Sequence, residues 1–246
     1  MKAALVTALV LAYLMPAYSI LRRLAKGRDD MTITALKVEG TVSIPQPGAK
    51  EVAAAMGLEV GRGDLQLSAT WAMKLPGRCR LQVGSVDSTR TAQVSYAQGK
   101  TKSDGPDIPG LVHAVNHACG ILALRSAGDG ESRAALEKHL STVKIDTRKV
   151  SLARFLGTSA FVLGPRDGPS QFWVYKDVSK DDFYPARVKF NDESGQAWDV
   201  RFIDYTSQAT GDWFPRQTEV WKGNELLLRF TALQGDGKPD ADALKL

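Results

Sequence analysis

Apolar and polar residues alternate along much of the sequence, and this alternation predicts β-strands. The pattern is clear in residues 36–44, and it returns in residues 65–75 and 79–83 on either side of the turn dipeptide Pro76-Gly77. A period of two with one apolar face is typical of strands that bury one side. These segments therefore predict an antiparallel sheet with a hairpin at Pro76. A shorter strand is expected at residues 91–98, followed by a polar loop at 99–110.

The last third of the chain repeats the pattern without intervening helices. From Ser159 onward, short alternating segments are separated by turn residues, as in 186–190 and 198–202. The final pair, 214–221 and 226–231, is joined by Gly223-Asn224. Such a succession indicates an antiparallel meander.

Between these two groups of strands the hydrophobic period changes to that of helices. Leu111, Val115, Ala118 and Leu122 mark one face of a helix, and a second helix is expected at residues 132–140. Shorter helices are expected at residues 21–30 and within the Pro- and Gly-containing segment 45–63. The fold class is therefore α+β and mainly β. A sheet this wide tends to curl, and the mid-chain helices are well placed to fill its concave side.

Residues 3–20 are almost wholly apolar, and this run bears on the compartment in which the protein is found. Ala17-Tyr18-Ser19 fits a signal-peptidase site, with cleavage after Ser19, although residues 3–20 are also long enough for a retained anchor. Arg22, Arg23 and Lys26 follow the apolar run and oppose its translocation. We favour export, because a β-rich globular chain follows. The expected division is a signal peptide or anchor (1–19), one domain (20–234) and a frayed tail (235–246).

Composition narrows the function classes. The chain has 246 residues, 43% of them hydrophobic, with a formal net charge of +5. Lys and Arg are scattered rather than clustered, so nucleic-acid binding is not expected. The only two cysteines, Cys79 and Cys119, could form one disulfide in an oxidising compartment or remain buried thiols, and we favour the disulfide.

Candidate catalytic chemistry is sparse. His113 and His117 are spaced as in zinc hydrolases, but the sequence His-Ala-Val-Asn-His lacks the glutamate that would act as general base. Cys119 falls about 200° around the helix from His117, so it cannot easily complete the ligand set. No nucleophile, phosphate-loop or dinucleotide motif is recognised. The sequence therefore predicts no catalytic residues, no metal site and no cofactor, with an enzyme built on these three residues as the least favoured alternative.

The apolar side of the strands carries many large side chains, and these could fill an ordinary core or line a lipid cavity. Trp173 and Trp221, on the opposite side, could mark a docking surface or be merely scattered aromatic residues. The candidate residues for an apolar ligand cavity are Leu67, Trp71, Met73, Leu81, Val188, Phe190, Trp198, Val200, Phe202, Leu226, Leu228 and Phe230.

Three C-terminal segments resemble the lipoprotein-carrier superfamily, which includes LolA-like and LolB-like outer-membrane lipoprotein-sorting proteins and RseB-related sensors. They are the strand ending in Asp204-Tyr205, the loop closing on Phe214-Pro215 and the final hairpin at Gly223-Asn224.

The resemblance implies an unclosed β-barrel with helices over its concave face, and an apolar cavity for the acyl chains of lipoproteins. We therefore expect a non-enzymatic periplasmic carrier of acylated lipoprotein or lipid, monomeric, that exchanges cargo with envelope donor and acceptor proteins. The alternative is an envelope sensor or assembly module that binds a protein partner through its sheet.

Overall fold

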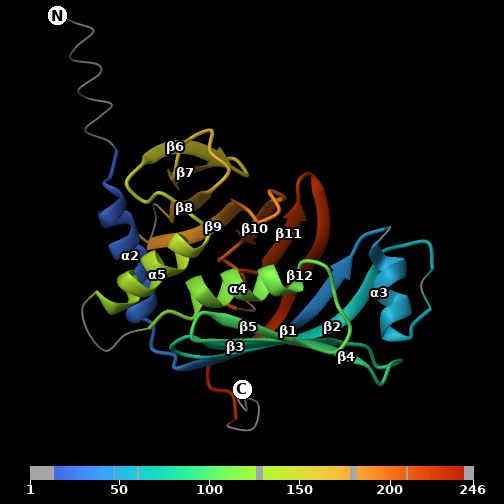
Figure 1. Cartoon of the computed structure of the whole chain (residues 1–246). Helices are drawn as coiled ribbons and strands as arrows, with labels where there is room; N and C mark the ends of the chain where they lie inside the picture. The colour runs from blue at the N-terminus through green and yellow to red at the C-terminus, as the bar shows by residue number, and fades with distance from the viewer. Residues whose placement is uncertain are drawn as a thin grey trace, which may run out of the picture.

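The computed structural model describes residues 14–240, except 47, 60, 126–129, 178–181 and 209. Its described part contains one twelve-stranded antiparallel sheet and four helices (Figure 1). The helices are α2 (Ala17–Asp29), α3 (Gly48–Met56), α4 (Leu111–Leu122) and α5 (Glu131–Thr142). The strands are β1 (Ala35–Ile44), β2 (Leu65–Lys74), β3 (Arg78–Gly84), β4 (Thr91–Ala97), β5 (Lys100–Asp104), β6 (Val150–Phe155), β7 (Thr158–Leu163), β8 (Gln171–Asp177), β9 (Asp182–Asn191), β10 (Ala197–Ile203), β11 (Gln217–Lys222) and β12 (Glu225–Asp236).

The sheet consists of two meanders joined at its centre. Its strand order is β5-β4-β3-β2-β1-β12-β11-β10-β9-β8-β7-β6, so the first strand of the chain pairs with the last. Strands β5 and β6 form the two edges, and within the described residues they do not pair with each other. The expected fold class is thereby confirmed as a mainly β, unclosed half-barrel with helices on its concave face.

The alternation seen in the sequence fixes the register of the central strands. Val38 lies opposite Trp71, and Val42 lies opposite both Leu67 on β2 and Phe230 on β12. These apolar side chains share the concave face because directly opposed residues of antiparallel strands point to the same side. Gly40 lies at the irregularity between β1 and β12, where a Cβ atom would overlap the backbone of β12.

Helix α4 lies across the concave face and contacts strands from both meanders, including β3, β4, β10 and β11. Its predicted apolar face is confirmed, since Leu111, Val115, Ala118 and Leu122 are all buried. Helix α5 packs on α2 and α4, α2 also packs on β9, and α3 packs against β2. Helices α2, α4 and α5 therefore form a layer inside the curve of the sheet, while α3 lies apart from them beside β1 and β2.

The convex face carries a row of paired charges across β9 to β12. Asp199 accepts hydrogen bonds from Arg187 (Nε···Oδ1 2.7 Å) and Arg201 (Nε···Oδ2 2.9 Å). Glu219 accepts one from Arg229 (Nε···Oε1 2.8 Å). Both carboxylates are buried, so each ionised oxygen needs these partners.

Two tryptophans complete this convex surface. The guanidinium of Arg187 lies 5.3 Å from the ring centroid of Trp173, and that of Arg201 lies 4.3 Å from Trp221. Cations stack favourably on aromatic faces at such distances. The two tryptophans singled out in the sequence are thus stacking partners of arginines, and the convex face is polar where the concave face is apolar.

Several boundaries differ from the sequence expectation. The expected polar loop at 99–110 contains β5, and β6 precedes the first strand expected after the helices. Strand β12 runs to Asp236, two residues into the expected tail. Helix α2 begins at Ala17, inside the segment expected to be a signal peptide or anchor, and buries Ile20 and Leu21. Residues 1–13 of that segment lie outside the described residues. Among the described helices, none has the length and apolar character needed to cross a bilayer.

Candidate functional site

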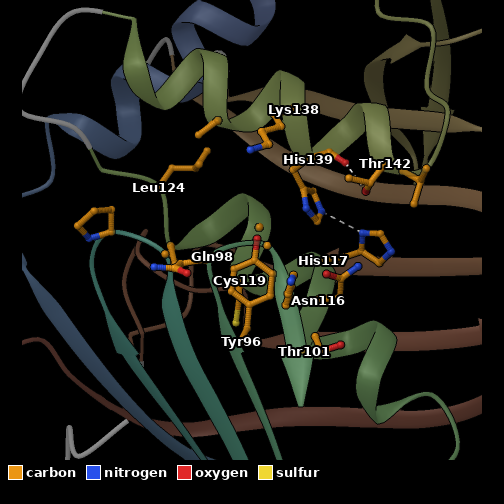
Figure 2. Close-up of a pocket in the computed structure, with 18 of the residues that line it drawn as sticks. Tyr96, Gln98, Thr101, Asn116, His117, Cys119, Leu124, Lys138, His139 and Thr142 are labelled. Carbon is orange, nitrogen blue, oxygen red and sulfur yellow. Dashed lines mark hydrogen bonds between the residues drawn. The ribbon is translucent and has the colours of Figure 1, made fainter. Parts of the chain in front are cut away.

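A hollow of the described structure lies between α4, α5 and the β4–β5 hairpin, and we call it the helix cavity (Figure 2). Its volume is about 1040 Å³. Its walls combine small and apolar residues with a few polar groups. The lining residues are Pro76, Gly77, Tyr96, Gln98, Gly99, Lys100, Thr101, Val112, His113, Asn116, His117, Cys119, Gly120, Ala123, Leu124, Arg125, Glu131, Ser132, Ala135, Lys138, His139, Thr142, Val143 and Phe190.

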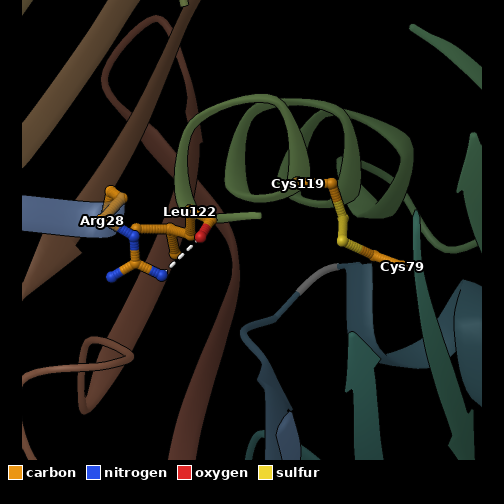
Figure 3. Close-up of a disulfide and its surroundings, with 4 residues drawn as sticks. All are labelled: Arg28, Cys79, Cys119 and Leu122. Carbon is orange, nitrogen blue, oxygen red and sulfur yellow. Dashed lines mark hydrogen bonds between the residues drawn. A yellow bond between two sulfur atoms is a disulfide. The ribbon is translucent and has the colours of Figure 1, made fainter. Parts of the chain in front are cut away.

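One wall of the cavity, helix α4, is held in place at its C-terminal half (Figure 3). Cys119 forms a disulfide with Cys79 on β3, with the two Cα atoms 6.0 Å apart. Arg28 of α2 donates hydrogen bonds to the carbonyl of Leu122, at the end of α4, and to the carbonyl of Trp213 (Nη1···O 3.0 Å). A cation at the C-terminus of a helix also interacts favourably with the helix dipole. This wall is therefore tied both to the sheet and to α2.

Burial affects the charge of Arg28. The side chain is almost fully buried, and this desolvation lowers its pKa to about 10. Because that value is still far above neutral pH, Arg28 stays charged, and the two carbonyl oxygens supply the polar partners that a buried cation requires.

The opposite wall, helix α5, meets α4 at a close approach through a glycine. A Cβ atom at Gly120 would overlap the imidazole of His139, so the ring of His139 lies directly on the α4 backbone. There it meets His117, with 3.2 Å between His117 Nδ1 and His139 Nε2. This imidazole pair is a direct polar link between α4 and α5 at the base of the cavity.

Both imidazoles of the pair are uncharged at neutral pH. Burial lowers the pKa of His139 to about 4. Burial, and then repulsion from His139 and His113, holds the pKa of His117 well below its usual value. One of the two nitrogens in the pair must then donate and the other accept. Within the described residues, His117 Nε2 is buried without a hydrogen-bond partner.

A cluster of tilted aromatic rings continues from this pair toward the sheet. The ring of His117 lies 4.7 Å from that of Phe190, and His113 lies 5.3 Å from Phe190 and 4.0 Å from Trp198. Burial lowers the pKa of His113 as well. The base of the cavity is thus made of neutral, largely buried rings.

The structure buries most of the sequence-predicted cavity residues in the core rather than around the helix cavity. Only Phe190 of that set lines the helix cavity. Trp198 is half-buried and lies beside it, against His113. The remaining members on the concave face are buried in the core, and they are Leu67, Trp71, Met73, Leu81, Val188, Val200, Phe202, Leu228 and Phe230.

Leu226 is a correction to that set. The register of β11 and β12 shifts between Val220 and Trp221, so that Leu228 lies opposite Val220 while Leu226 lies opposite Trp221. Because a bulge inserts one extra residue, it moves the following side chains to the other face. Leu226 therefore lies on the convex side with Trp221.

The three candidate metal ligands do not form a ligand set. Cys119 is joined to Cys79, and the imidazole of His117 turns to His139 instead. Among the described residues, no group of three or more His, Cys, Asp or Glu side chains is arranged to hold a metal ion.

Sequence reasoning missed most of the cavity lining. The signal was present on the less apolar face of α4, where Val112, Asn116 and Gly120 recur every four residues. His139 lies among the charged residues of α5, yet it is buried because its partner comes from α4. That contact joins two helices, so no local period within α5 could have predicted it.

Comparison with known proteins gives structural likenesses only, since no family model and no curated protein matches the chain. A LolA superfamily protein from Nitrosomonas europaea is similar with a TM-score of 0.48 and 9% identity, over 93% of this chain and 96% of that one. A domain described as an outer membrane lipoprotein-sorting protein from Vibrio parahaemolyticus has a TM-score of 0.45 and 11% identity, over 93% and 97%. A DUF1329 family protein from Desulfovibrio piger has a TM-score of 0.43 and 9% identity, over 94% and 98%.

Proposed function

We propose that this protein is a non-enzymatic carrier that binds the acyl chains of lipids or lipoproteins in the helix cavity. The observation that carries the proposal is a hollow of about 1040 Å³ with a largely apolar base, between two helices on the concave side of a half-barrel. Ligand sites for small molecules typically occupy about 300–1,000 Å³, so the space suffices for an acyl chain.

The chemistry of the walls suits a hydrocarbon that is bound without covalent change. Val112, Ala123, Leu124, Val143 and Phe190 supply apolar surface on several sides. Burying hydrocarbon is worth about 0.8 kcal/mol per CH₂, so a chain of about sixteen carbons could gain up to ~12 kcal/mol before costs. Release then needs a wall that can move.

Helix α5 is the better candidate for a moving wall. The C-terminal half of α4 is tied to β3 and to Arg28. Helix α5 contacts α4 and α2 more than the sheet, through the His117–His139 pair and a hydrogen bond from Ser132 to Asp29. Displacement of α5 would widen the cavity without breaking the core beneath α4.

The compartment proposed for this activity is the periplasm. The apolar run before Arg22 supports export, and a disulfide persists in oxidising compartments. In that setting the carrier would receive its cargo from an envelope donor and pass it to an acceptor.

The test uses two neighbouring alanines of α5 that differ in one respect. Ala134 and Ala135 are both exposed, but only Ala135 lines the helix cavity. Ala135→Trp should fill part of the cavity and lower the affinity for a fluorescent fatty acid at least tenfold, whereas Ala134→Trp should bind as the wild type does. Native mass spectrometry of the protein from its own envelope fraction should show lipid or acylated peptide near one per chain.

Equal affinity of the wild type and both variants would place the ligand elsewhere. An absence of fatty-acid binding by the wild type, together with a mass free of lipid, would refute the carrier function. The partner-binding alternative would then be tested by affinity capture on the sheet edges.

A further inference from the structure

The charged residues of the helix cavity gather at its solvent side. Lys100, Glu131 and Lys138 are exposed, and Arg125 is half-buried. These four are the charged side chains among the described lining residues, three cations against one carboxylate. The mouth of the cavity therefore carries a net positive charge.

The base of the cavity carries no such charge. His117 and His139 are buried and uncharged at neutral pH, because burial lowers the pKa of both. Ala123, Leu124 and Phe190 are buried beside them. The cavity is thus uncharged at its base and cationic at its mouth. An amphiphile would fit this arrangement with its hydrocarbon chain at the base and its headgroup at the mouth.

Two cations at the mouth are available to a ligand. Within the described structure, the ammonium groups of Lys100, on β5, and Lys138, on α5, take part in no hydrogen bond or ion pair. Figure 2 shows the side chain of Lys138 on the cavity side of α5. Arg125, in contrast, already donates a hydrogen bond to the carbonyl of Ile33. Lys100 and Lys138 line the cavity from different walls, the first from β5 and the second from α5.

We propose that the helix cavity selects amphiphiles with an anionic headgroup, a carboxylate or a phosphate, which Lys100 and Lys138 bind at the mouth. This inference rests on the proposed acyl-chain binding and names the class of cargo. Free fatty acids and anionic phospholipids have such headgroups. The acylated cysteine of a lipoprotein does not, because its chains are joined through thioether, ester and amide groups that are not ionised.

The experiment compares ligands that share one chain and differ in the head. Hexadecanoate, hexadecanol and hexadecylamine each compete with a fluorescent fatty acid for the full chain at pH 7.5. Two solvent-exposed ion pairs are together worth about a factor of ten in affinity, so hexadecanoate should bind about tenfold more tightly than hexadecanol, and hexadecylamine more weakly than both. The advantage of hexadecanoate should shrink as salt is raised from about 10 mM to 500 mM, because salt screens exposed charges.

Variants assign the effect to the two lysines. The double variant Lys100→Gln/Lys138→Gln should lose about tenfold in affinity for hexadecanoate and keep the wild-type affinity for hexadecanol, which also shows that the cavity is intact. Lys102→Gln is the matched control, since Lys102 is an exposed lysine of the same strand that does not line the cavity. It should bind all three ligands as the wild type does.

The possible failures are distinguishable. Equal affinities for hexadecanoate and hexadecanol would overturn the headgroup selection and leave acyl-chain binding in place. The same would follow if the double variant kept the preference for hexadecanoate. Displacement by none of the three ligands would overturn acyl-chain binding itself.

Discussion

The side of α4 that faces the sheet and the side that faces α5 are built from different residues and leave different amounts of space. Toward the sheet, Leu111, Val115 and Leu122 are buried against apolar strands, and Cys119 is bonded to β3. Toward α5 lie Asn116 and Gly120, on the helix cavity.

The two sides of α4 show that a row of large apolar side chains does not by itself indicate a ligand cavity. Large apolar side chains on the sheet fill the volume beneath α4, because protein interiors are close-packed. Space for a ligand remains on the other side, which small residues such as Ala123 and Ala135 line. The fold thus combines a close-packed core with a cavity.

The largest expected effect tests the packed side. Trp71 is fully buried, and its ring centroid lies 5.6 Å from that of Phe214 and 6.2 Å from that of Phe230. Trp71→Ala should lower the free energy of unfolding by about 3–5 kcal/mol, measured by urea denaturation, because it leaves a large cavity in the core.

Trp71→Phe separates core packing from ligand binding. Within the described residues the indole Nε1 of Trp71 has no partner, so Trp71→Phe removes no hydrogen bond. Its affinity for a fluorescent fatty acid should equal that of the wild type. A tenfold loss of affinity in this folded variant would instead indicate that the ligand binds against the apolar face of the sheet, as the sequence pattern predicted.

Much of the fold could be predicted because it depends on local periods. The alternation in residues 65–75 and 198–202 predicts strands β2 and β10, and Leu111 to Leu122 predicts the buried face of α4. Edge strands β5 and β6 were missed because each pairs on one side only and is less buried, so its residues need not alternate.

The candidate site was harder to predict because it depends on contacts between elements. Leu226 was placed on the wrong face because a bulge in β12 interrupts the alternation. The cavity itself depends on how α5 lies over α4, and the contact between Gly120 and His139 that sets this distance joins residues from two helices.

The second prediction concerns the covalent tie on the packed side. The disulfide links residues 40 positions apart, and a loop of that length is worth about 2–4 kcal/mol through the restriction of the unfolded chain. Cys79→Ala/Cys119→Ala should therefore lower the free energy of unfolding by about that amount. Dithiothreitol should destabilise the wild type similarly and leave the double variant unchanged. An equal effect of the reductant on both proteins would show that the bond does not form in solution.

The third prediction concerns the imidazole pair on the cavity side. The pKa of His139 is about 4 in the folded protein and 6.5 in its ordinary state, so the unfolded chain binds more protons between these values. The contribution of neutral His139 to the free energy of unfolding is then fully present above pH 6.5. It is lost as the pH falls toward 4, and the shift of the His139 pKa makes this loss about 3 kcal/mol.

Other groups also titrate in acid, so the test is a difference between two proteins. Urea denaturation of the wild type and His139→Gln is compared between pH 7.5 and 4.5. The variant should be less stable at neutral pH and lose less stability in acid. Parallel pH profiles for the two proteins would mean that His139 is not held neutral by burial.

The smallest effect concerns the contact that sets the distance between α4 and α5, and two helix glycines provide a matched pair. A Cβ at Gly120 would overlap His139, whereas a Cβ at Gly27 in α2 meets nothing within 4 Å. Gly120→Ala should therefore cost about 1–3 kcal/mol of unfolding free energy through overpacking, and it should alter fatty-acid affinity by pushing α5 away from α4. Gly27→Ala should instead stabilise by about 0.5–1 kcal/mol, because alanine is the better helix former, and leave the affinity unchanged. If both variants were more stable than the wild type and bound the fatty acid equally well, the ring of His139 would not pack on α4 at Gly120. The distance between α4 and α5 would then not depend on this contact.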